Sequence, residues 1–309
     1  MSLFRPYNYK ARPDLPSDAP VKNGFFLFFE LFFRKFWRFV TVNIFYFLVT
    51  LPLLIVVYFT VNGYFADIII SESGEFQDML AGVGILASIV NYIPSFLYLP
   101  LVIISAILYG PATMGITYIF RNFAREEHAW MSDFVSRGWA NFRQGVFFGL
   151  LDIIVVYLLA NGILADLIVG TGTAAAVGSI VLRTLSVIAL IVYLFMRHYF
   201  YMTAVSVNLS CFAIIKNAWL FVVLGFWRNV VAGVACLLVT VLCFLTIPLV
   251  SLITLPFLYY SLTGFIVVFT CYPVVKRYII VPALEMAEKQ KTEEERQKTE
   301  GDGAGETEE

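Results

Sequence analysis

The chain has 309 residues, of which 60% are hydrophobic, 17% are aromatic and only 14% are charged. Soluble domains carry about a quarter charged residues and under half apolar ones, so this composition excludes an ordinary soluble protein. It indicates a polytopic α-helical membrane protein. A β-barrel is not favoured, because its strands run for about ten residues and alternate apolar with polar side chains. The net charge of −1 says little, because the charges are strongly sorted along the chain. In the charged stretch 122–145, Glu126, Glu127 and Asp133 offset much of the basic charge, so the lipid bilayer is the expected partner and nucleic acid is not.

The two ends of the chain differ from its middle. Residues 1–20 form a polar, proline-rich segment without the apolar stretch of a signal peptide, so we expect the first span to act as an uncleaved anchor. Residues 21–285 form the expected membrane domain. Residues 286–309 are rich in Glu and Lys without apolar periodicity, and this acidic tail is predicted to be disordered and cytoplasmic.

Six apolar stretches in the middle are long enough to cross a bilayer, which takes about 20 residues. We predict an all-α domain of six transmembrane helices, at residues 39–62, 95–119, 146–166, 178–200, 229–250 and 256–277. The segment 81–93 is apolar but too short to cross, and it is expected to be either an interfacial or a re-entrant piece.

Lysine and arginine collect on one side of these spans. Seven lie before the first span, four between the second and third, three between the fourth and fifth or at their ends, and six after the last. Together they account for 20 of the 21 basic residues. Because loops rich in Lys and Arg stay on the cytoplasmic side, both termini are predicted to be cytoplasmic.

An aromatic–arginine pair stands just before each odd-numbered span: Trp37-Arg38, Phe142-Arg143 and Trp227-Arg228. These six residues are predicted to anchor the protein at the membrane interface. A short helical pattern leads into each pair, at 24–38, 131–142 and 212–227. Such helices lie in the headgroup plane with their rings toward the acyl chains. We therefore expect three units, each an interfacial helix followed by a hairpin of two spans.

The charged stretch 122–145 is interpreted as the central cytoplasmic turn and its interfacial helix. Ser132 is the expected N-cap of that helix, with Asp133 in the first turn. In the first unit, Glu30, Arg34 and Arg38 fall at i, i+4 and i+8, so they are expected to form one polar stripe on a single helix.

Four ionisable residues stand inside or at the ends of the third and fourth spans, where charge is costly and points to function. Residues at equal depth in an antiparallel hairpin have numbers with a constant sum, and the pairs Asp152–Arg197 and Asp166–Arg183 share one sum. We therefore predict two ion pairs at matching depths, about 21 Å apart along the hairpin.

Two interpretations of these pairs stay open. In the first, each pair neutralises charge in a low-dielectric environment and holds the hairpin together. In the second, Asp152 and Arg197, with His198 beside them, line a polar cavity that is open to the cytoplasm.

The sequence predicts no catalytic residue, cofactor-binding site or metal site, and hence no enzyme. The four cysteines lie in apolar surroundings and, with only two histidines in the chain, match no metal spacing. The glycine-rich segment 170–178 lacks the preceding strand and the lysine of a phosphate-binding loop. No sequence motif pairs a nucleophile with a base.

The segment 109–145 reads "YGPATMGITYIFRNFAREEHAWMSDFVSRGWANFRQG". Its motifs are Gly110-Pro111, the spacing of Arg121 and Arg125, the acidic turn, Asp133-Phe134 and residues 141–144. With them the chain resembles the YesL-like family of bacterial integral membrane proteins, a domain of unknown function, and residues 28–52 look similar to the first helix and span of that family. The resemblance covers roughly residues 20–285. It implies a bacterial cell-membrane protein, often encoded near carbohydrate-uptake systems, and it carries over no catalytic or ligand-binding residue.

Two functional hypotheses from different classes follow. The first is a non-catalytic accessory or scaffold protein that serves carbohydrate uptake or sensing, with a membrane transporter complex as its partner. The second is a small secondary transporter or channel that uses the polar groups around Asp152 and Arg197. Transporters commonly show inverted repeats and sites at the midplane, whereas the three units expected here share one orientation, which favours the first hypothesis. The sequence specifies neither a substrate nor an oligomeric state.

Overall fold

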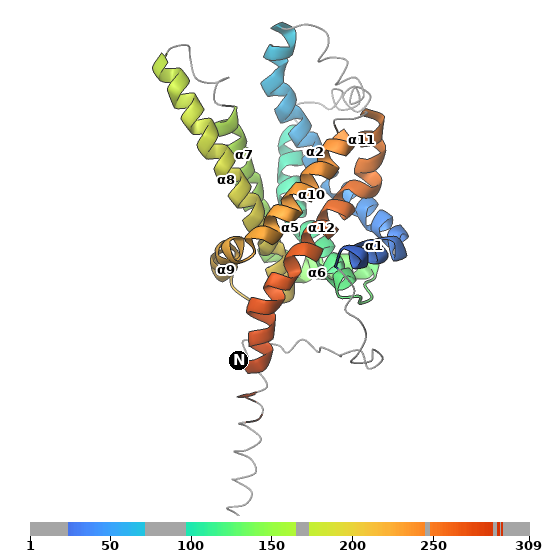
Figure 1. Ribbon diagram of the computed structural model, residues 1–309. Coiled ribbons are helices and arrows are strands. Elements are labelled where there is room, and N and C mark those ends of the chain that lie inside the picture. The colour runs from blue at the N-terminus through green and yellow to red at the C-terminus, as the bar shows by residue number, and fades with distance from the viewer. Residues whose placement is uncertain are drawn as a thin grey trace, which may run out of the picture.

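The computed structural model describes residues 24–71, 97–164, 173–244 and 248–286, together with residues 289, 290 and 292. Every regular element within these ranges is a helix (Figure 1). The apolar segment 81–93, Asp166, the N-terminal segment 1–20 and most of the acidic tail lie outside the described residues.

Six helical runs are long and apolar enough to cross a membrane. Each overlaps one predicted span, so the prediction of six apolar helices of spanning length is confirmed, and they indicate an integral, multi-pass membrane protein. The runs are α2 (Phe36–Ser71), α5 (Tyr98–Ala124), α7 (Phe142–Ile163), α8 (Thr173–Ser206), α10 (Phe226–Phe244) and a last one made of α11 (Pro248–Thr254), η3 (Leu255–Tyr259), α12 (Tyr260–Val275) and η4 (Lys276–Ile280).

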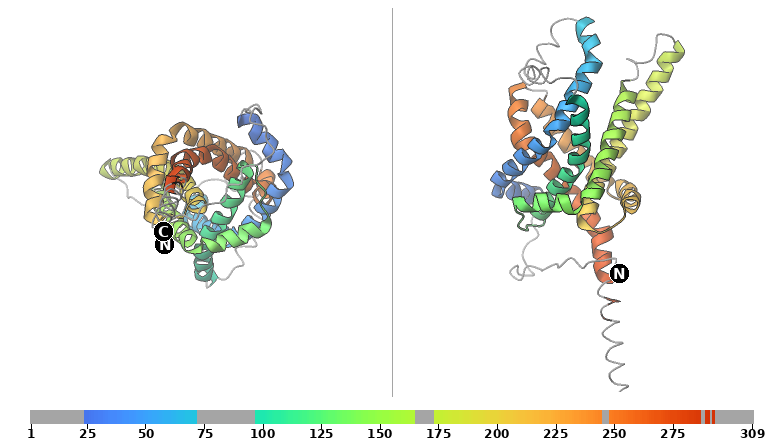
Figure 2. Two further views of the ribbon diagram at one scale, coloured as in Figure 1. Left: turned by 90° about the horizontal axis from the view of Figure 1, so that it is seen from below. Right: turned by 180° about the vertical axis from the view of Figure 1, so that it is seen from behind.

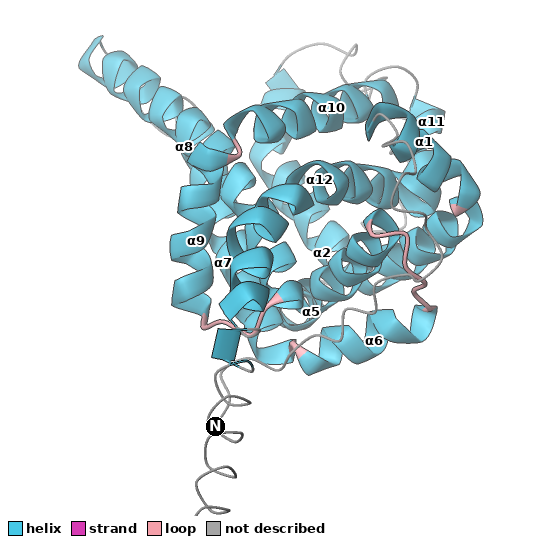
Figure 3. Ribbon diagram, turned by 60° about the horizontal axis from the view of Figure 1, so that its bottom comes forward, coloured by secondary structure: helices cyan, strands magenta, loops and turns pink. Residues whose placement is uncertain are grey.

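Three short helices lie across one end of the bundle, at an angle to the long helices (Figures 1 and 2). They are α1 (Gly24–Arg34), α6 (Met131–Ala140) and α9 (Cys211–Leu224), and we call them the elbow helices. With this end turned forward they lie around the rim of the bundle (Figure 3). One residue separates each elbow helix from the long helix that follows it, and we call this residue the joint.

The three joints share one hydrogen-bond pattern. The joint residue donates its N–H to the carbonyl four residues earlier, and its own carbonyl accepts the N–H four residues later. The bonds are Lys35 to Leu31 (3.2 Å) and Phe39 to Lys35 (3.1 Å), Asn141 to Arg137 (3.2 Å) and Gly145 to Asn141 (2.7 Å), and Gly225 to Phe221 (2.8 Å) and Asn229 to Gly225 (2.9 Å). Helical hydrogen bonding therefore continues through each bend and pairs backbone groups that lipid would leave unsatisfied.

When the three segments are aligned on their joint residues, their sequences match differently from an alignment on the aromatic–arginine pairs. The residue after each joint is a phenylalanine: Phe36, Phe142 or Phe226. Phe142 therefore corresponds to Phe36 and Phe226 rather than to Trp37 and Trp227. All six predicted anchors lie in the first turn of a long helix, after the bend, and not on an elbow helix.

Two local predictions are wrong. The polar stripe of the first unit is divided, because α1 ends at Arg34 and Arg38 belongs to α2. Only Glu30 and Arg34 share a helix, with 3.5 Å between their charged groups. Helix α6 begins at Met131, so Ser132 lies inside it and is not the N-cap. The Asp133 carboxylate instead accepts the N–H of Trp130 at 2.8 Å and satisfies one free donor of the helix start.

The charged turn between α5 and α6 contacts the first joint. Arg34 pairs with Glu126 at 3.3 Å, and Lys35 Nζ donates to the Glu127 carbonyl at 2.8 Å. The "AREEH" segment thus connects two elbow helices that are separated by the first two spans.

Helices α5, α8 and α12 contact one another, and α5 is the most buried of the long helices. Helix α2 packs against α5, α7 against both α5 and α8, and α10 against α12. Nearly all of α5 between Gly110 and Phe123 is buried, as expected for an apolar helix that is surrounded by others. The α7–α8 hairpin leans away from the remaining helices toward the end opposite the elbow helices (Figure 1).

Helices α5 and α7 approach backbone to backbone near the elbow end. A Cβ atom added at Gly110 would meet the carbonyl oxygen of Gly145, and one added at Gly149 would lie 2.8 Å from the Cα of Gly110. Small residues allow membrane helices to pack this closely.

The last span contains a π-helical turn, η3, that a buried asparagine of α2 contacts at both ends. The Asn43 side chain donates to the Leu255 carbonyl at 2.9 Å and accepts the Ser261 N–H at 2.8 Å. Side chains that insert into the hydrogen-bond ladder are a known cause of such irregular turns. Asn43 therefore ties the first span to the last.

Replacing Gly110 with Ala is expected to lower the unfolding temperature of the purified protein, because the added methyl group overlaps the backbone of α7. Overpacking costs roughly 1–3 kcal/mol, and more where whole helices must separate. Gly178→Ala is the matched control, since a Cβ atom there meets nothing within 4 Å. Circular dichroism during heating in detergent measures both variants, and equal unfolding temperatures would contradict the close packing of α5 on α7.

Candidate functional site

Asp152 on α7 and Arg197 on α8 form an ion pair between the two helices. Arg197 Nε donates to Asp152 Oδ2 at 2.8 Å, and the side chains are 3% exposed for Asp152 and 24% for Arg197. The structure thus brings together the two residues for which the numbering predicted equal depth. Removing either partner would leave the other charge uncompensated in a low-dielectric environment.

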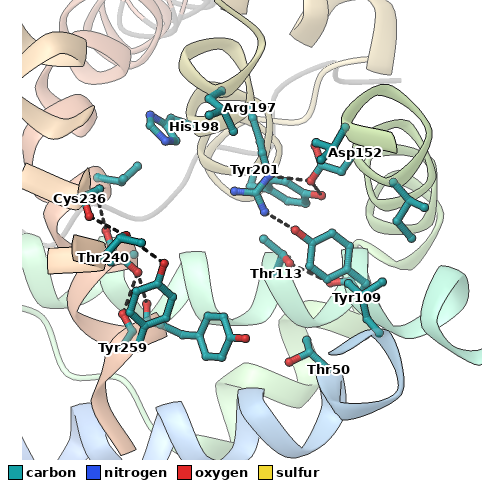
Figure 4. A pocket seen from close by; sticks show the side chains of 18 of the residues that line it. Thr50, Tyr109, Thr113, Asp152, Arg197, His198, Tyr201, Cys236, Thr240 and Tyr259 are labelled. Atoms are coloured by element: carbon teal, nitrogen blue, oxygen red, sulfur yellow. Dashed lines mark hydrogen bonds and ion pairs between the residues drawn. The ribbon is translucent and has the colours of Figure 1, made fainter. Parts of the chain in front are cut away.

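Three tyrosines complete this charge cluster. The hydroxyl of Tyr193 donates to Asp152 Oδ1, and that of Tyr201 donates to Oδ2, both at 2.6 Å. Arg197 Nη2 donates to the Tyr109 hydroxyl at 2.5 Å (Figure 4). Both carboxylate oxygens are therefore engaged, and the guanidinium is held between α7 and α5.

Sequence reasoning found the ion pair but missed the tyrosines. Tyr193, Arg197 and Tyr201 are spaced by four on α8 and share one face, so this spacing was an available signal. No such spacing pointed to Tyr109, because it lies on α5, 88 residues before Arg197. It joins the cluster through the close approach of α5 and α7 at the neighbouring Gly110.

The cluster lies in the wall of a cavity of about 1010 Å³ between the long helices. Residues from α2, α5, α7, α8, α10, η3 and α12 line this central cavity, and most of them are aliphatic or aromatic. A second polar group faces the cluster across the space, where the hydroxyls of Thr240 and Tyr259 lie 3.1 Å apart (Figure 4).

The central cavity retains polar groups that a bound molecule can use. His198 lines it, and its Nδ1 is buried without a hydrogen-bond partner among the residues that the structure describes. Within the same described part of the chain, Arg197 engages two of its five N–H donors. An unsatisfied buried polar atom is costly, so a ligand that pairs with these groups would be stabilised.

The central cavity extends from the charge cluster in both directions, and on α5 its lining reaches Phe120 toward the elbow helices. Its lining reaches Thr60 on α2 and Leu164 on α7, toward the end where the α7–α8 hairpin leans outward (Figure 1).

The second predicted ion pair does not contribute to this site within the described residues. Arg183 Nε donates to the Ile163 carbonyl at 3.2 Å, at the junction of α7 and α8. Its predicted partner Asp166 lies outside the described residues.

The six predicted anchors are spread around the elbow end and do not converge on one site. Trp37 and Trp227 are 79% and 77% exposed, and Arg143 is also exposed. The other three have contacts: Arg38 Nη1 donates to the Ala129 carbonyl (3.5 Å), Arg228 Nη1 donates to the Thr270 carbonyl (3.1 Å), and the Phe142 ring lies 5.1 Å from the Trp139 ring.

The metal-ligating and thiol side chains in the described part of the chain lie apart from one another or are unmodified. No three side chains among its His, Cys, Asp and Glu residues come together as metal ligands. Cys211, Cys236, Cys243 and Cys271 are free thiols. Burial raises the pKa of the Cys211 thiol, so at neutral pH this group is less nucleophilic than an exposed cysteine.

Neither the protein-family models, nor the curated proteins, nor the solved structures that were compared with this chain give a match. The resemblance to the YesL-like family therefore rests on the residues quoted for it.

The geometry is suited to holding a ligand. The Asp152 carboxylate accepts three hydrogen bonds and is committed to Arg197 and the tyrosines. Arg197 keeps donors for an acceptor group, and the surrounding walls suit an apolar body. The arrangement thus offers one polar end and a large apolar volume, as small-molecule sites commonly do.

Asp152→Asn and Arg197→Met are each expected to destabilise the protein by about 3–5 kcal/mol, because each leaves a buried polar or charged partner unpaired. The double variant is expected to lose less than the two single losses combined, since it removes both members of the pair. Arg228→Met, which removes an exposed arginine, is the matched control. Unfolding titrations in mixed micelles measure all four variants, and strictly additive losses would contradict the coupling.

Proposed function

We propose that this chain is a non-catalytic integral membrane protein that holds an amphipathic molecule in its central cavity. The observation that carries the proposal is the cavity of about 1010 Å³, with mainly apolar walls and the Asp152–Arg197 cluster on one side. Ligand sites for small molecules occupy roughly 300–1,000 Å³. A cavity at the top of this range suits a lipid-like body rather than an ion or a single small solute.

The polar end of the proposed ligand follows from the groups that face it. Arg197 keeps N–H donors, and His198 Nδ1 lines the same space. Both favour a ligand whose polar end carries hydrogen-bonding oxygen atoms, with an acceptor toward Arg197. The apolar remainder would lie along α2 and α10, toward the end opposite the elbow helices.

The proposal includes the placement of the protein in the membrane. The elbow helices and joints carry exposed aromatic side chains, among them Phe25, Phe33 and Trp139, which are 66%, 68% and 74% exposed. Such rings prefer the boundary between headgroups and acyl chains. Together with the one-sided lysines and arginines, they support three interfacial-helix-plus-hairpin units with both termini in the cytoplasm, and the YesL-like motifs support a bacterial cell membrane.

The physiological role that we favour is that of an accessory or scaffold protein, with a carbohydrate-uptake or sensing complex as its partner. The resemblance to the YesL-like family supports this partner class. The three joints share one hydrogen-bond pattern, consistent with repeats of one orientation rather than the inverted repeats common in transporters. In this role the ligand stays bound and stabilises the bundle.

A small secondary transporter or channel is the second candidate. The observation in its favour is the position of a charged cluster in the wall of a large cavity, since ionisable residues inside spans often mark a pathway. The two roles differ in the fate of the ligand, which an accessory protein retains and a transporter exchanges.

Ala160→Trp is expected to remove most of the bound amphipathic molecule, because Ala160 lines the central cavity and an indole would fill part of it. Leu158→Trp is the matched control on the same helix, since Leu158 is 62% exposed on the outer surface. Native mass spectrometry of protein extracted in mild detergent measures the bound mass.

Occupancy in the wild type and in Leu158→Trp, with a loss of several-fold in Ala160→Trp, is the expected result. Empty wild-type protein, or equal occupancy in both variants, would overturn the proposed function. Rapid exchange of the bound molecule with added lipid would favour the transporter over the accessory role.

Cysteine labelling tests the orientation. In a variant without the four native cysteines, Ser136→Cys on α6 is expected to react with an impermeant maleimide only after cell lysis, because the elbow helices are proposed to face the cytoplasm. Glu75→Cys, between the first two spans, is expected to react in intact cells. The reverse pattern would invert the proposed topology.

A further inference from the structure

A second, smaller cavity lies at the elbow end of the bundle, apart from the charge cluster. It has a volume of about 220 Å³ and is formed where the end of α5 meets the end of α8 and the η4 turn of the last span. Arg121, Arg125 and Lys276 line it, beside the hydroxyl of Ser206. We call it the basic pocket.

Arg121 is the buried cation of the basic pocket, with 1% of the residue exposed. Its Nη1 donates to the Val205 carbonyl at 2.5 Å and to Ser206 Oγ at 3.3 Å, and its Nη2 donates to Asn122 Oδ1 at 3.1 Å. The guanidinium also lies 4.6 Å from the centre of the Tyr118 ring. These contacts fix a permanently charged group in one position against the pocket, and such preorganisation lowers the cost of binding an anion.

The other two cations come from different parts of the chain. Arg125 follows α5 and pairs with Glu127 at 2.8 Å, and Lys276 is exposed at the first position of η4. The Glu127 side chain is 39% exposed, so it can turn to solvent when a stronger anion enters. Two guanidinium groups and an ammonium then face one small space.

One wall of the basic pocket is apolar. Ile280, at the end of η4, and Val281 and Leu284, in the helical residues that follow it, line this wall. η4 itself is a π-helical turn, in which the Val281 N–H reaches the Lys276 carbonyl, and such turns are frequent at functional sites. A charged end and an apolar wall together match a headgroup that carries an acyl chain.

We propose that the basic pocket binds a phosphate group, with the headgroup of an anionic phospholipid as its source. Arginine forks match the oxygens of phosphate, and basic pockets between membrane helices bind phosphorylated headgroups. The pocket lies at the level of the elbow helices, where the exposed aromatic rings place the headgroup region. The proposal rests on the residues that line the basic pocket and not on the function proposed for the central cavity.

The test uses the full chain in a maltoside detergent, which contains no phosphate. The probes are phosphatidic acid, a diacylglycerol with the same acyl chains, and inorganic phosphate. Binding is followed by the rise in unfolding temperature as each probe is added. Lys276→Gln and Arg125→Gln are the test variants, and Arg277→Gln is the matched control, because Arg277 is the exposed neighbour of Lys276 and does not line the pocket.

Phosphatidic acid is expected to bind saturably, and each test variant to weaken it about tenfold, the loss of one charge-assisted hydrogen bond. Arg277→Gln is expected to change binding less than about twofold, as for an exposed charge. Binding of the lipid alone assigns the phosphate to a headgroup, and binding of inorganic phosphate with equal affinity assigns it to a soluble anion.

Three results would overturn the proposal. Diacylglycerol could bind as tightly as phosphatidic acid, neither phosphate probe could bind, or Arg277→Gln could weaken binding as much as Lys276→Gln. The last result would mean that diffuse surface charge, and not the pocket, attracts the anion. Far-UV circular dichroism of each variant without probe verifies that the fold is kept.

Discussion

Surrounding lipid offers no hydrogen bonds, so polar groups inside this bundle are stabilised by pairing within the protein. The constraint is most visible where the chain departs from regular helix. The fully buried Asn229 accepts from the Tyr199 hydroxyl at 2.6 Å and donates to the carbonyls of Phe221 and Val222 near the end of α9. Gln144 reaches the Leu209 carbonyl at 2.7 Å. Asn229 thus lies where α9 bends into α10, Gln144 contacts the chain just before α9 starts, and Asn43 contacts the chain around the π-helical turn η3. In each case an amide side chain pairs backbone groups where a helix is irregular.

The same constraint explains the charge cluster. The buried Asp152 requires a cation and enough donors to cover both of its oxygens, and these all come from α8. The contact with Tyr109 then requires α5 to lie against α7, which the glycines of both helices allow. Once these helices are drawn together at the elbow end, the straight α7–α8 hairpin diverges at the other end. The central cavity lies between these helices, and the proposed ligand would occupy volume that the helices themselves do not fill.

Much of this fold can be predicted from sequence, because hydropathy over 20 residues is a strong signal that tertiary contacts seldom reverse. The Asp152–Arg197 contact was also predictable, since antiparallel helices fix which residues share a depth. The alignment of the three joints with one another was harder to predict. Composition alone matched Phe142-Arg143 to the tryptophan–arginine pairs, whereas backbone hydrogen bonds at Asn141 place the joint one residue earlier. The sequence did not predict the basic pocket, because Arg125 and Lys276 are about 150 residues apart. They come together only through the packing of α12 against α5.

The two cavities follow one another along α5, α8 and the last span. On α5, Phe120 lines the central cavity and the adjacent Arg121 lines the basic pocket. On α8, Tyr201 and Ser206 divide in the same way, and the last span contributes Val268 to one site and Tyr272 to the other. Any shift of α12 relative to α5 therefore changes the shape of both sites. If both proposed ligands bind, each is expected to alter the affinity for the other, because a coupling between two sites on shared rigid elements acts in both directions.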